Sequence, residues 1–148
     1  MHISRYMDPK LVLFLNATTR DEVLSQMVQN LFNAGKLNHQ EQFLQAILDR
    51  EKIVSTGIGL GIAIPHAKLA SYNEFFIVIG ILDKPVQWNA LDGAPVRMVF
   101  MIGGPDDKQT EYLQILSSLT QFLKNEEHRQ QILSLKFPTD ILELFHSI

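Results

Sequence analysis

The chain contains no cysteine among its 148 residues, which excludes a disulfide framework and any chemistry that depends on a thiol. It has no apolar run of about 18 residues, the length of a membrane span, and its N-terminus lacks the basic-then-apolar pattern of a signal peptide. Positive charge is not in excess, since the formal net charge is −3, and this argues against a broad nucleic-acid-binding surface. We therefore expect a cytoplasmic protein with no nucleic-acid partner and no membrane insertion.

The rest of the composition is that of an ordinary globular protein, with 46% hydrophobic and 20% charged residues. A chain of this length can bury roughly two-thirds of its unfolded surface in one core region. No internal repeat or low-complexity tract divides it, so we expect residues 1–148 to form a single domain. Residues 1–18 are apolar without a clear period, and we treat them as a variable segment with no assigned role.

Two capping patterns predict helices early in the chain. Thr19-Arg20-Asp21-Glu22 is a capping box that opens an amphipathic helix, and Gly35 is placed to end it. A second box, Asn38-His39-Gln40-Glu41, opens a helix that ends near Arg50 and Glu51.

Strands and then further helices are predicted after residue 70. The apolar runs 75–82 and 96–102 have the length and β-branched content of buried strands, and the segment 85–88, which begins with Pro85, predicts an edge strand. A long amphipathic helix is predicted over 110–123, followed by two short helices. This order predicts an α/β domain in three layers, with a mixed sheet of about five strands flanked by helices on both faces.

The most informative stretch is Ser55-Thr56-Gly57-Ile58-Gly59-Leu60-Gly61-Ile62-Ala63-Ile64-Pro65-His66. Its three alternating glycines predict a tight loop whose backbone N–H groups form an anion-binding nest, with hydroxyl donors from Ser55 and Thr56 at its mouth. Residues 62–64 predict a short buried strand, and His66 follows it at the end where open α/β sheets place ligands. A nucleophile beside backbone donors points to phosphate chemistry.

Imidazole suits a phosphoryl carrier, because it is partly neutral near pH 7 and leaves readily once protonated. One ring nitrogen attacks, and a backbone carbonyl within 64–68 is expected to hold the other. The guanidinium of Arg50 has the planar fork that suits phosphate oxygens. Simpler interpretations stay open: His66 as a strand-end histidine, Arg50 as a helix C-terminal cation, and Ser55 and Thr56 as turn formers.

The stretch resembles the active-site loop of enzyme IIA domains of the fructose–mannitol class in the bacterial sugar phosphotransferase system, a class that includes the nitrogen-regulatory IIA proteins. The resemblance extends from about Thr19 to the C-terminus and implies the family's α/β fold. It further implies that His66 is phosphorylated by a histidine phosphocarrier protein, that Arg50 is its catalytic cationic neighbour, and that no cofactor takes part. The matching residues are Arg50, Glu51, Ser55 to Gly59 and Gly61 to His66.

The sequence departs from the family's pattern at three places. Leu60 stands where Asn is frequent, and Ala67 where Gly often follows the active histidine. Tyr112 stands where many members carry a second histidine, and a tyrosine can donate one hydrogen bond but carries no positive charge at neutral pH. We expect Tyr112 to help bind the phosphoryl group, together with Ser55, Thr56, Gly57, Gly59 and Gly61. The alternative is that its ring only packs on the apolar edge of the helix.

Several functions are compatible with this resemblance. A nitrogen-regulatory carrier that signals to a transporter or kinase is favoured, since no fused sugar-specific domain accompanies the chain, and a relay to a sugar-specific IIB subunit is the alternative. A binding module that has lost phosphoryl transfer is a second class, supported by Tyr112 and Leu60. A hydrolase with His66 as base is disfavoured, because no Ser or Cys has a nucleophile's context, and no residues have the spacing of metal ligands.

Overall fold

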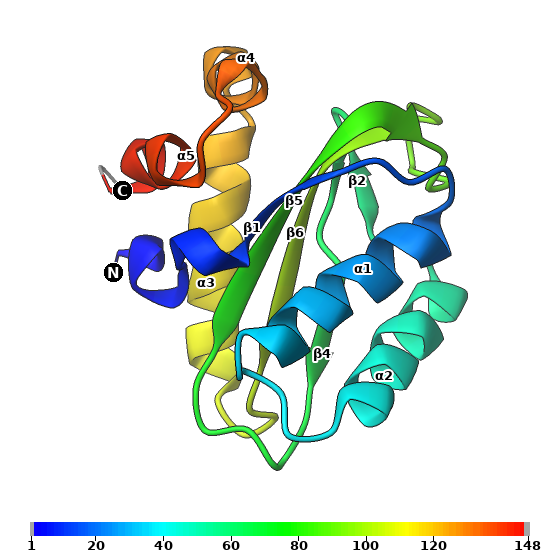
Figure 1. Ribbon diagram of the computed structural model, residues 1–148, viewed down its shortest axis with the longest axis vertical. Coiled ribbons are helices and arrows are strands. Elements are labelled where there is room, and N and C mark those ends of the chain that lie inside the picture. The colour runs from blue at the N-terminus through cyan, green and yellow to red at the C-terminus, as the bar shows by residue number, and fades with distance from the viewer. Residues whose placement is uncertain (1, 147–148) are drawn as a thin grey trace.

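A six-stranded mixed sheet forms the middle layer of the molecule (Figure 1). The structure is a computed structural model and describes residues 2–146. The strands follow the order β1-β5-β6-β3-β2, and β4 also pairs with β6. Their bounds are Val12–Leu15 (β1), Gly57–Gly59 (β2), Ile62–Ala63 (β3), His66–Lys68 (β4), Phe76–Val86 (β5) and Val96–Gly104 (β6).

Helices cover both faces of the sheet, which confirms the predicted three-layer arrangement (Figure 1). One face carries α1 (Arg20–Asn33) and α2 (Gln40–Ile53). The other carries α3 (Gln109–Leu123), α4 (Glu126–Ser134) and α5 (Pro138–Phe145), together with two short 3-10 helices, η1 (Ile3–Tyr6) and η2 (Pro9–Leu11). No helix within residues 2–146 has both the length and the apolar composition to cross a membrane.

The central pair of strands, β5 and β6, runs antiparallel, with Phe76 opposite Gly103 and Ile81 opposite Met98. The predicted separate edge strand at 85–88 is wrong, because β5 continues through Pro85 to Val86 after an irregular register. The other neighbour of β5, β1, pairs with it only as far as Leu82. Proline is therefore tolerated here, because no strand on that side needs its missing N–H.

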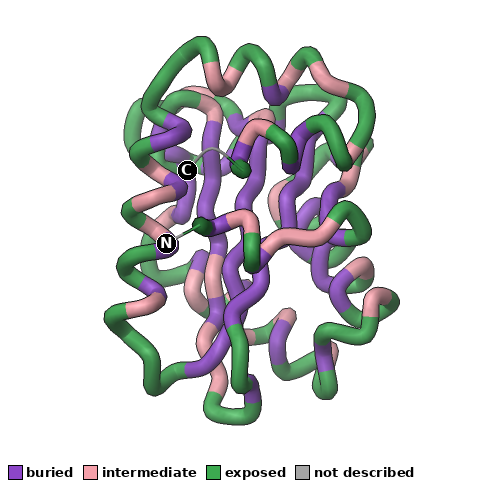
Figure 2. Tube along the Cα trace, turned by 90° about the vertical axis from the view of Figure 1, so that its left-hand side faces the viewer, coloured by how far each residue is buried: buried purple, intermediate pink, exposed green. Residues whose placement is uncertain are grey.

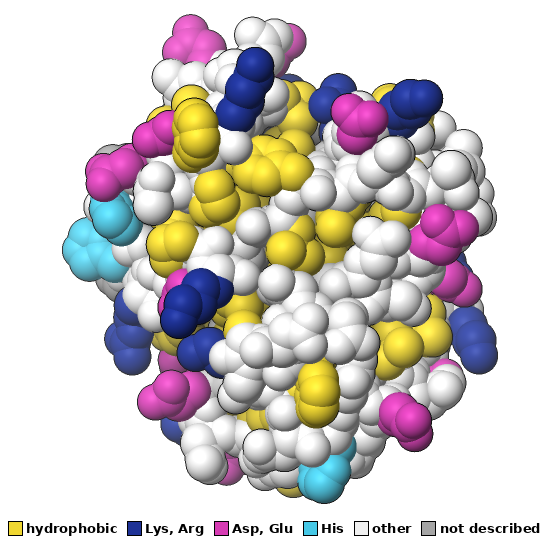
Figure 3. Space-filling model, in the orientation of Figure 1, with side chains coloured by type: hydrophobic (Ala, Val, Ile, Leu, Met, Phe, Trp, Pro, Cys, Tyr) yellow, Lys and Arg dark blue, Asp and Glu magenta, His cyan; other side chains and the backbone are white. Residues whose placement is uncertain are grey.

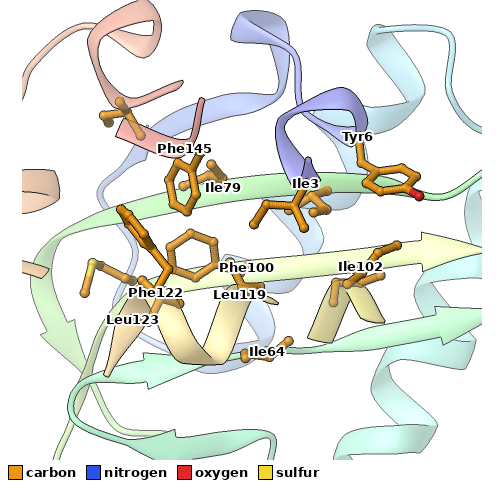
Figure 4. Packing of buried hydrophobic residues seen from close by; sticks show 14 of the residues in the cluster. Ile3, Tyr6, Ile64, Ile79, Phe100, Ile102, Leu119, Phe122, Leu123 and Phe145 are labelled. Atoms are coloured by element: carbon orange, nitrogen blue, oxygen red, sulfur yellow. The ribbon is translucent and has the colours of Figure 1, made fainter. Parts of the chain in front are cut away.

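The sheet separates two hydrophobic cores, and Figure 2 shows its strands as the most continuously buried part of the chain. Alternate side chains of β5 enter opposite cores, as the period of two in a strand requires. Ile77 and Ile79 lie in the core beneath η1, α3 and α5, whereas Phe76 and Val78 lie in the core beneath α1 and α2. Figure 4 shows the first of these cores from close by.

The helix starts follow the predicted caps with two differences. The Thr19 hydroxyl accepts a hydrogen bond from the Glu22 N–H at 3.2 Å, but the Glu22 carboxylate reaches Thr18 instead of Thr19. The second box is shifted, since α2 begins at Gln40 and His39 occupies the N-cap position without a side-chain hydrogen bond.

Acidic and basic side chains are interspersed over the face shown in Figure 3, consistent with the small net charge.

Candidate functional site

The glycine-rich run folds as a β-hairpin rather than as one open loop. Strands β2 and β3 pair antiparallel, and Gly59, Leu60 and Gly61 close the hairpin with φ values of 95°, 62° and 77°. The carboxylate of Asp92 fixes this turn, because Oδ2 accepts from the Leu60 N–H and Oδ1 from the Ala94 N–H, both at 3.0 Å. The positive φ values explain why glycine flanks the turn.

The closing turn of the hairpin lies far from His66. Strands β3 and β4 pair with β6 in one continuous parallel register, with Ile62 opposite Met98 and His66 opposite Ile102. Four extended residues at about 3.3 Å each place Ile62 about 13 Å along the sheet from His66. Gly59 and Gly61 lie beyond Ile62, so the structure does not bring these two predicted phosphate-binding residues, or Leu60, to the histidine.

Thr56 lies at the open end of the hairpin, where its carbonyl accepts from the Ile64 N–H at 3.0 Å. Its hydroxyl donates to the buried carboxylate of Glu51 and accepts from Trp88 Nε1 at 3.2 Å. Its N–H donates to Glu51 Oε1 at 3.0 Å. These donors are all engaged within the protein, so this conformation does not present Thr56 to an anion beside His66.

Ser55 and Gly57 are engaged in the same way. The Ser55 hydroxyl donates to the Trp88 carbonyl at 2.6 Å and accepts from the Gly57 N–H at 3.0 Å. A Cβ at position 57 would lie 2.8 Å from the Ala90 Cβ, so glycine is required there by close packing. The Gly57 N–H is therefore engaged within the protein, and the geometry favours the turn-former interpretation of Ser55.

His66 is the first residue of β4 and is half-buried. Its Nδ1 lies 3.2 Å from the carbonyl oxygen of Ile64, which falls within the segment expected to supply such an acceptor. A carbonyl only accepts, so this contact places the proton of the neutral ring on Nδ1. Nε2 is then left with its lone pair.

The surroundings of His66 favour the neutral ring. Burial lowers the pKa of His66 below its ordinary value of 6.5, and the positive charges of Arg50 and Lys68 lower it further. The Ile64 carbonyl and the charge of Glu51 act in the opposite direction without reversing the shift. At pH 7 the imidazole is therefore a neutral nucleophile between two cations.

The two cations reach the site from different elements. Arg50 lies in the last turn of α2, and one of its guanidinium nitrogens donates to the Val54 carbonyl at 2.9 Å, which leaves its other donors for an anion. Lys68 lies two residues after His66 on β4 and therefore on the same face of the strand. Its Nζ donates to Gln109 Oε1 at 2.6 Å and lies 4.2 Å from the centre of the Tyr112 ring.

Tyr112 lies in the first turn of α3, with its ring centre 5.5 Å from that of His66. The same ring packs against Phe75 at 6.3 Å and is buried, so it both packs and faces the histidine. Burial raises the pKa of Tyr112, so the phenol stays protonated at neutral pH and can donate. Within residues 2–146 its hydroxyl forms no hydrogen bond, which leaves that donor available.

Sequence reasoning gave no role to two residues of the site, although one of them, Glu51, belongs to the matching motif. Glu51 is only 4% exposed and binds Thr56 through both carboxylate oxygens, so it joins the end of α2 to the start of the hairpin. Lys68 supplies the second cation. The period of two along a strand that begins at His66 would have indicated Lys68, but no local pattern marks Glu51 as buried.

Comparisons with known proteins identify close relatives of the chain. A family model described as "Phosphoenolpyruvate-dependent sugar phosphotransferase system, EIIA 2" matches residues 5–148. A fructose-specific EIIABC component of Bacillus subtilis is 39% identical over 134 residues, which cover 90% of this chain and 21% of that protein. A nitrogen regulatory protein of Bradyrhizobium diazoefficiens is 27% identical over 128 residues, which cover 86% of this chain and 83% of that protein. The chain thus spans about a fifth of the length of the EIIABC relative.

Solved structures share the fold. Nitrogen regulatory protein IIA-Ntr from Neisseria meningitidis matches with a TM-score of 0.90 at 22% identity, covering 97% of this chain and 98% of that chain. The IIA mannitol protein of Escherichia coli, solved in complex with phosphorylated IIB mannitol enzyme, matches with a TM-score of 0.79 at 22% identity. The match covers 94% of this chain and 96% of that chain. These likenesses confirm the mixed α/β architecture.

Proposed function

The chain belongs to the EIIA 2 family of the phosphoenolpyruvate-dependent sugar phosphotransferase system, and we propose that it carries a phosphoryl group on Nε2 of His66. The observation that carries the proposal is the contact between His66 Nδ1 and the Ile64 carbonyl at 3.2 Å. It fixes the tautomer whose nucleophilic nitrogen is Nε2. The lowered pKa of His66 keeps that nitrogen unprotonated at neutral pH.

The proposed step is an in-line exchange between two histidines. The Nε2 lone pair attacks the phosphorus of a phosphohistidine on a small histidine phosphocarrier protein. A new N–P bond forms at His66 as the donor's N–P bond breaks, and the donor imidazole leaves with the electron pair of that bond. The Nδ1 proton stays on the ring of His66, held by Ile64, and the resulting positive charge makes the ring a good leaving group for the next transfer.

The chain's own side chains stabilise the transferred charge in this proposal. Phosphoryl transfer depends mainly on positioning and on neutralising the equatorial oxygens. Arg50 supplies unoccupied guanidinium donors, Lys68 a second positive charge, and the Tyr112 hydroxyl one neutral donor. Nucleophile and charge partners all come from the chain, so the step needs no cofactor.

The identity of the next acceptor distinguishes two functions. A sugar-specific relay would pass the group to a IIB subunit, and the 39% identity to a fructose-specific EIIABC component supports this candidate. A nitrogen-regulatory carrier would instead alter its binding to a transporter or kinase when phosphorylated, and the likeness to a nitrogen regulatory protein along 83% of its length supports that candidate. Both act in the cytoplasm in this proposal.

The test is phosphoryl uptake from phosphoenolpyruvate in the presence of enzyme I and a histidine phosphocarrier. We expect an acid-labile mass gain of about 80 Da, the mass of one phosphoryl group on a nucleophilic residue. His66→Gln should abolish the gain, and the matched control His128→Gln should keep it. Uptake that persists in His66→Gln contradicts the proposal, and so does a folded parent protein that takes up no phosphate. If the mass gain is lost when a IIB subunit is added, the protein is the sugar-specific relay. If the mass gain is retained, the protein is the regulator.

A further inference from the structure

The start of α3, which carries Tyr112, has no cap of its own. Its N-cap residue, Lys108, forms no capping hydrogen bond through its side chain. The first turn of a helix has N–H groups without intrahelical partners, so an uncapped start depends on contacts from elsewhere. The position of Tyr112 beside His66 is therefore set by whatever holds residues 108–111.

Within residues 2–146, three side-chain hydrogen bonds link this start to distant segments. Lys68 donates to Gln109 at 2.6 Å, and Lys108 donates to the Asn73 carbonyl at 3.3 Å, although both of these contacts are exposed. The third is partly buried: the Tyr6 hydroxyl of η1 donates to Glu111 Oε2 at 2.6 Å across a separation of 105 residues. It is also the contact that ends on the residue directly before Tyr112.

The geometry of Tyr6 makes this contact specific. Burial and the neighbouring Glu111 raise the pKa of Tyr6 to about 12, so its hydroxyl remains a donor to the carboxylate. A short hydrogen bond to an ionised acceptor is among the stronger kinds. Figure 4 shows Ile3 and Tyr6 extending from the N-terminal segment onto the sheet.

A second set of contacts, between aromatic rings, also connects Tyr6 to Tyr112 and His66. The Tyr6 ring meets Phe75 edge-on at 6.4 Å, Phe75 packs against Tyr112 at 6.3 Å, and Tyr112 faces His66 at 5.5 Å. The Tyr6–Phe75 pair is edge-to-face, a preferred geometry for aromatic rings, and the other two pairs are tilted, so these rings connect Tyr6 to His66.

We propose that Tyr6 and Glu111 are positioning residues for phosphoryl transfer, which act by holding Tyr112 against His66. The inference rests on the proposed function of His66 and gives residues 2–11 a role that their sequence did not indicate. Tyr6 itself does not touch the transferred group. Its effect should therefore appear in the rate of transfer and not in the affinity for the phosphocarrier.

The first test is Tyr6→Phe, which removes only the hydroxyl and keeps the ring that packs on Phe75. We expect kcat for phosphorylation of His66 to fall about three- to tenfold, because small displacements of a positioning group reduce the rate strongly. KM for the phosphocarrier should be unchanged. The NMR signals of the Tyr112 ring and the His66 imidazole should shift in the unphosphorylated protein, which a purely stabilising contact would not cause.

The partner residue supplies the rescue and the coupling tests. Glu111→Gln retains an acceptor oxygen and should retain most of the rate, whereas Glu111→Ala should be as slow as Tyr6→Phe. If the two residues act through one contact, the double variant Tyr6→Phe/Glu111→Ala should be no slower than either single variant. Multiplied effects in the double variant overturn the proposal.

Tyr72→Phe is the matched control, because Tyr72 is also buried and its hydroxyl has no hydrogen-bond partner in the described part of the chain. We expect it to match the parent in rate and in the signals of His66. The proposal is overturned if Tyr6→Phe leaves kcat and the two sets of NMR signals unchanged, or if it changes only KM. Failure of the parent to accept phosphate refutes the proposed function instead, and the NMR comparison still tests the contact.

Discussion

The protonation state of one nitrogen, Nε2 of His66, decides whether the site can accept a phosphoryl group. Its lone pair is available only above the pKa of the ring, which burial and the charges of Arg50 and Lys68 lower below 6.5. Uptake should therefore persist below pH 6.5 and decline only as the pH falls through the lowered value. Between the lowered pKa and pH 6.5, the free energy of unfolding should rise with pH, because His66 is protonated in the unfolded chain but not in the folded protein.

An NMR titration of His66 tests this electrostatic account. In the parent protein the midpoint should lie below 6.5, and Arg50→Gln should raise it because one nearby positive charge is removed. Arg20→Gln, at an arginine that pairs with Asp21 on α1, is the control and should leave the midpoint in place. A midpoint above 6.5 in the parent, or no change in Arg50→Gln, contradicts the account.

Tyr112 can be tested independently of the histidine. Its ring lies 5.5 Å from that of His66, and within residues 2–146 its hydroxyl has no hydrogen-bond partner. A hydrogen bond to a charged group is worth roughly 1.5–3 kcal/mol. If it forms only in the transition state, Tyr112→Phe should slow phosphorylation on the order of ten- to a hundredfold. Tyr112→His should preserve or raise the rate. If single-turnover rates of both variants equal that of the parent, Tyr112 only packs.

At the scale of elements, the Glu51–Thr56 contact joins the end of α2 to the hairpin. Thr56→Val has nearly the same shape but leaves Trp88 Nε1 unpaired and removes one bond from the Glu51 carboxylate. We expect the free energy of unfolding to fall by about 1–3 kcal/mol in denaturant titrations. Thr120→Val, which loses bonds to two helix carbonyls only, should cost less.

The same variant decides between two roles for Thr56. If Thr56 has only a structural role, the phosphorylation rate of the folded Thr56→Val protein should equal that of the parent. Unchanged stability together with a lost rate would instead support direct phosphate binding, as the sequence alone predicted.

The hairpin turn supplies a separate prediction. Leu60 has a positive φ of 62°, a conformation that costs an ordinary side chain roughly 1–2 kcal/mol and that Asn tolerates better. Leu60→Asn should raise the free energy of unfolding by about 0.5–1 kcal/mol. Leu60→Ala removes the exposed side chain without relieving the backbone and should give no such gain. Neither variant should alter phosphorylation, and a slower transfer in both would show that the turn belongs to the site.

The predictability of the fold differed between long and short elements. The buried strands β5 and β6 and the helix α3 were predicted because their patterns are continuous and local. The edge strand β1 was missed, because four residues in an irregular apolar segment carry too little periodicity. The segment around Pro85 was predicted at an edge but wrongly as a separate strand, because only the tertiary structure shows that it continues β5 past the end of β1.

The site was predictable in part for the same reason. The structure brings His66, Arg50 and Tyr112 together, as the motif spacing and the resemblance indicated. Phosphate binding by the glycines stays a prediction, because three alternating glycines fit a hairpin turn as well as an anion nest, and only the register with β6 shows which way the turn points. Phosphate binding by Ser55 and Thr56 also stays a prediction, and the sequence could not show that their hydroxyls contact Trp88, more than thirty residues away.

For the molecule as a whole, the site lies where the two helical layers meet at the sheet. Arg50 comes from α2 on one face, and Tyr112 comes from α3 on the other, with His66 and Lys68 on the strand between them. Ala67 belongs to the core beneath α1 and α2, whereas Ile64 belongs to the core beneath α3. Both cores therefore support the geometry of the histidine.

In the proposed transfer, Nε2 of His66 accepts the phosphoryl group while Nδ1 keeps its proton. NMR of the protein labelled with nitrogen-15 in histidine, and phosphorylated from phosphoenolpyruvate through enzyme I and the phosphocarrier, observes both nitrogens. We expect a one-bond phosphorus–nitrogen coupling at Nε2 of His66 alone, with Nδ1 still protonated beside the Ile64 carbonyl. Coupling at Nδ1 of His66 or at His128, or no phosphorus–nitrogen coupling, would contradict it.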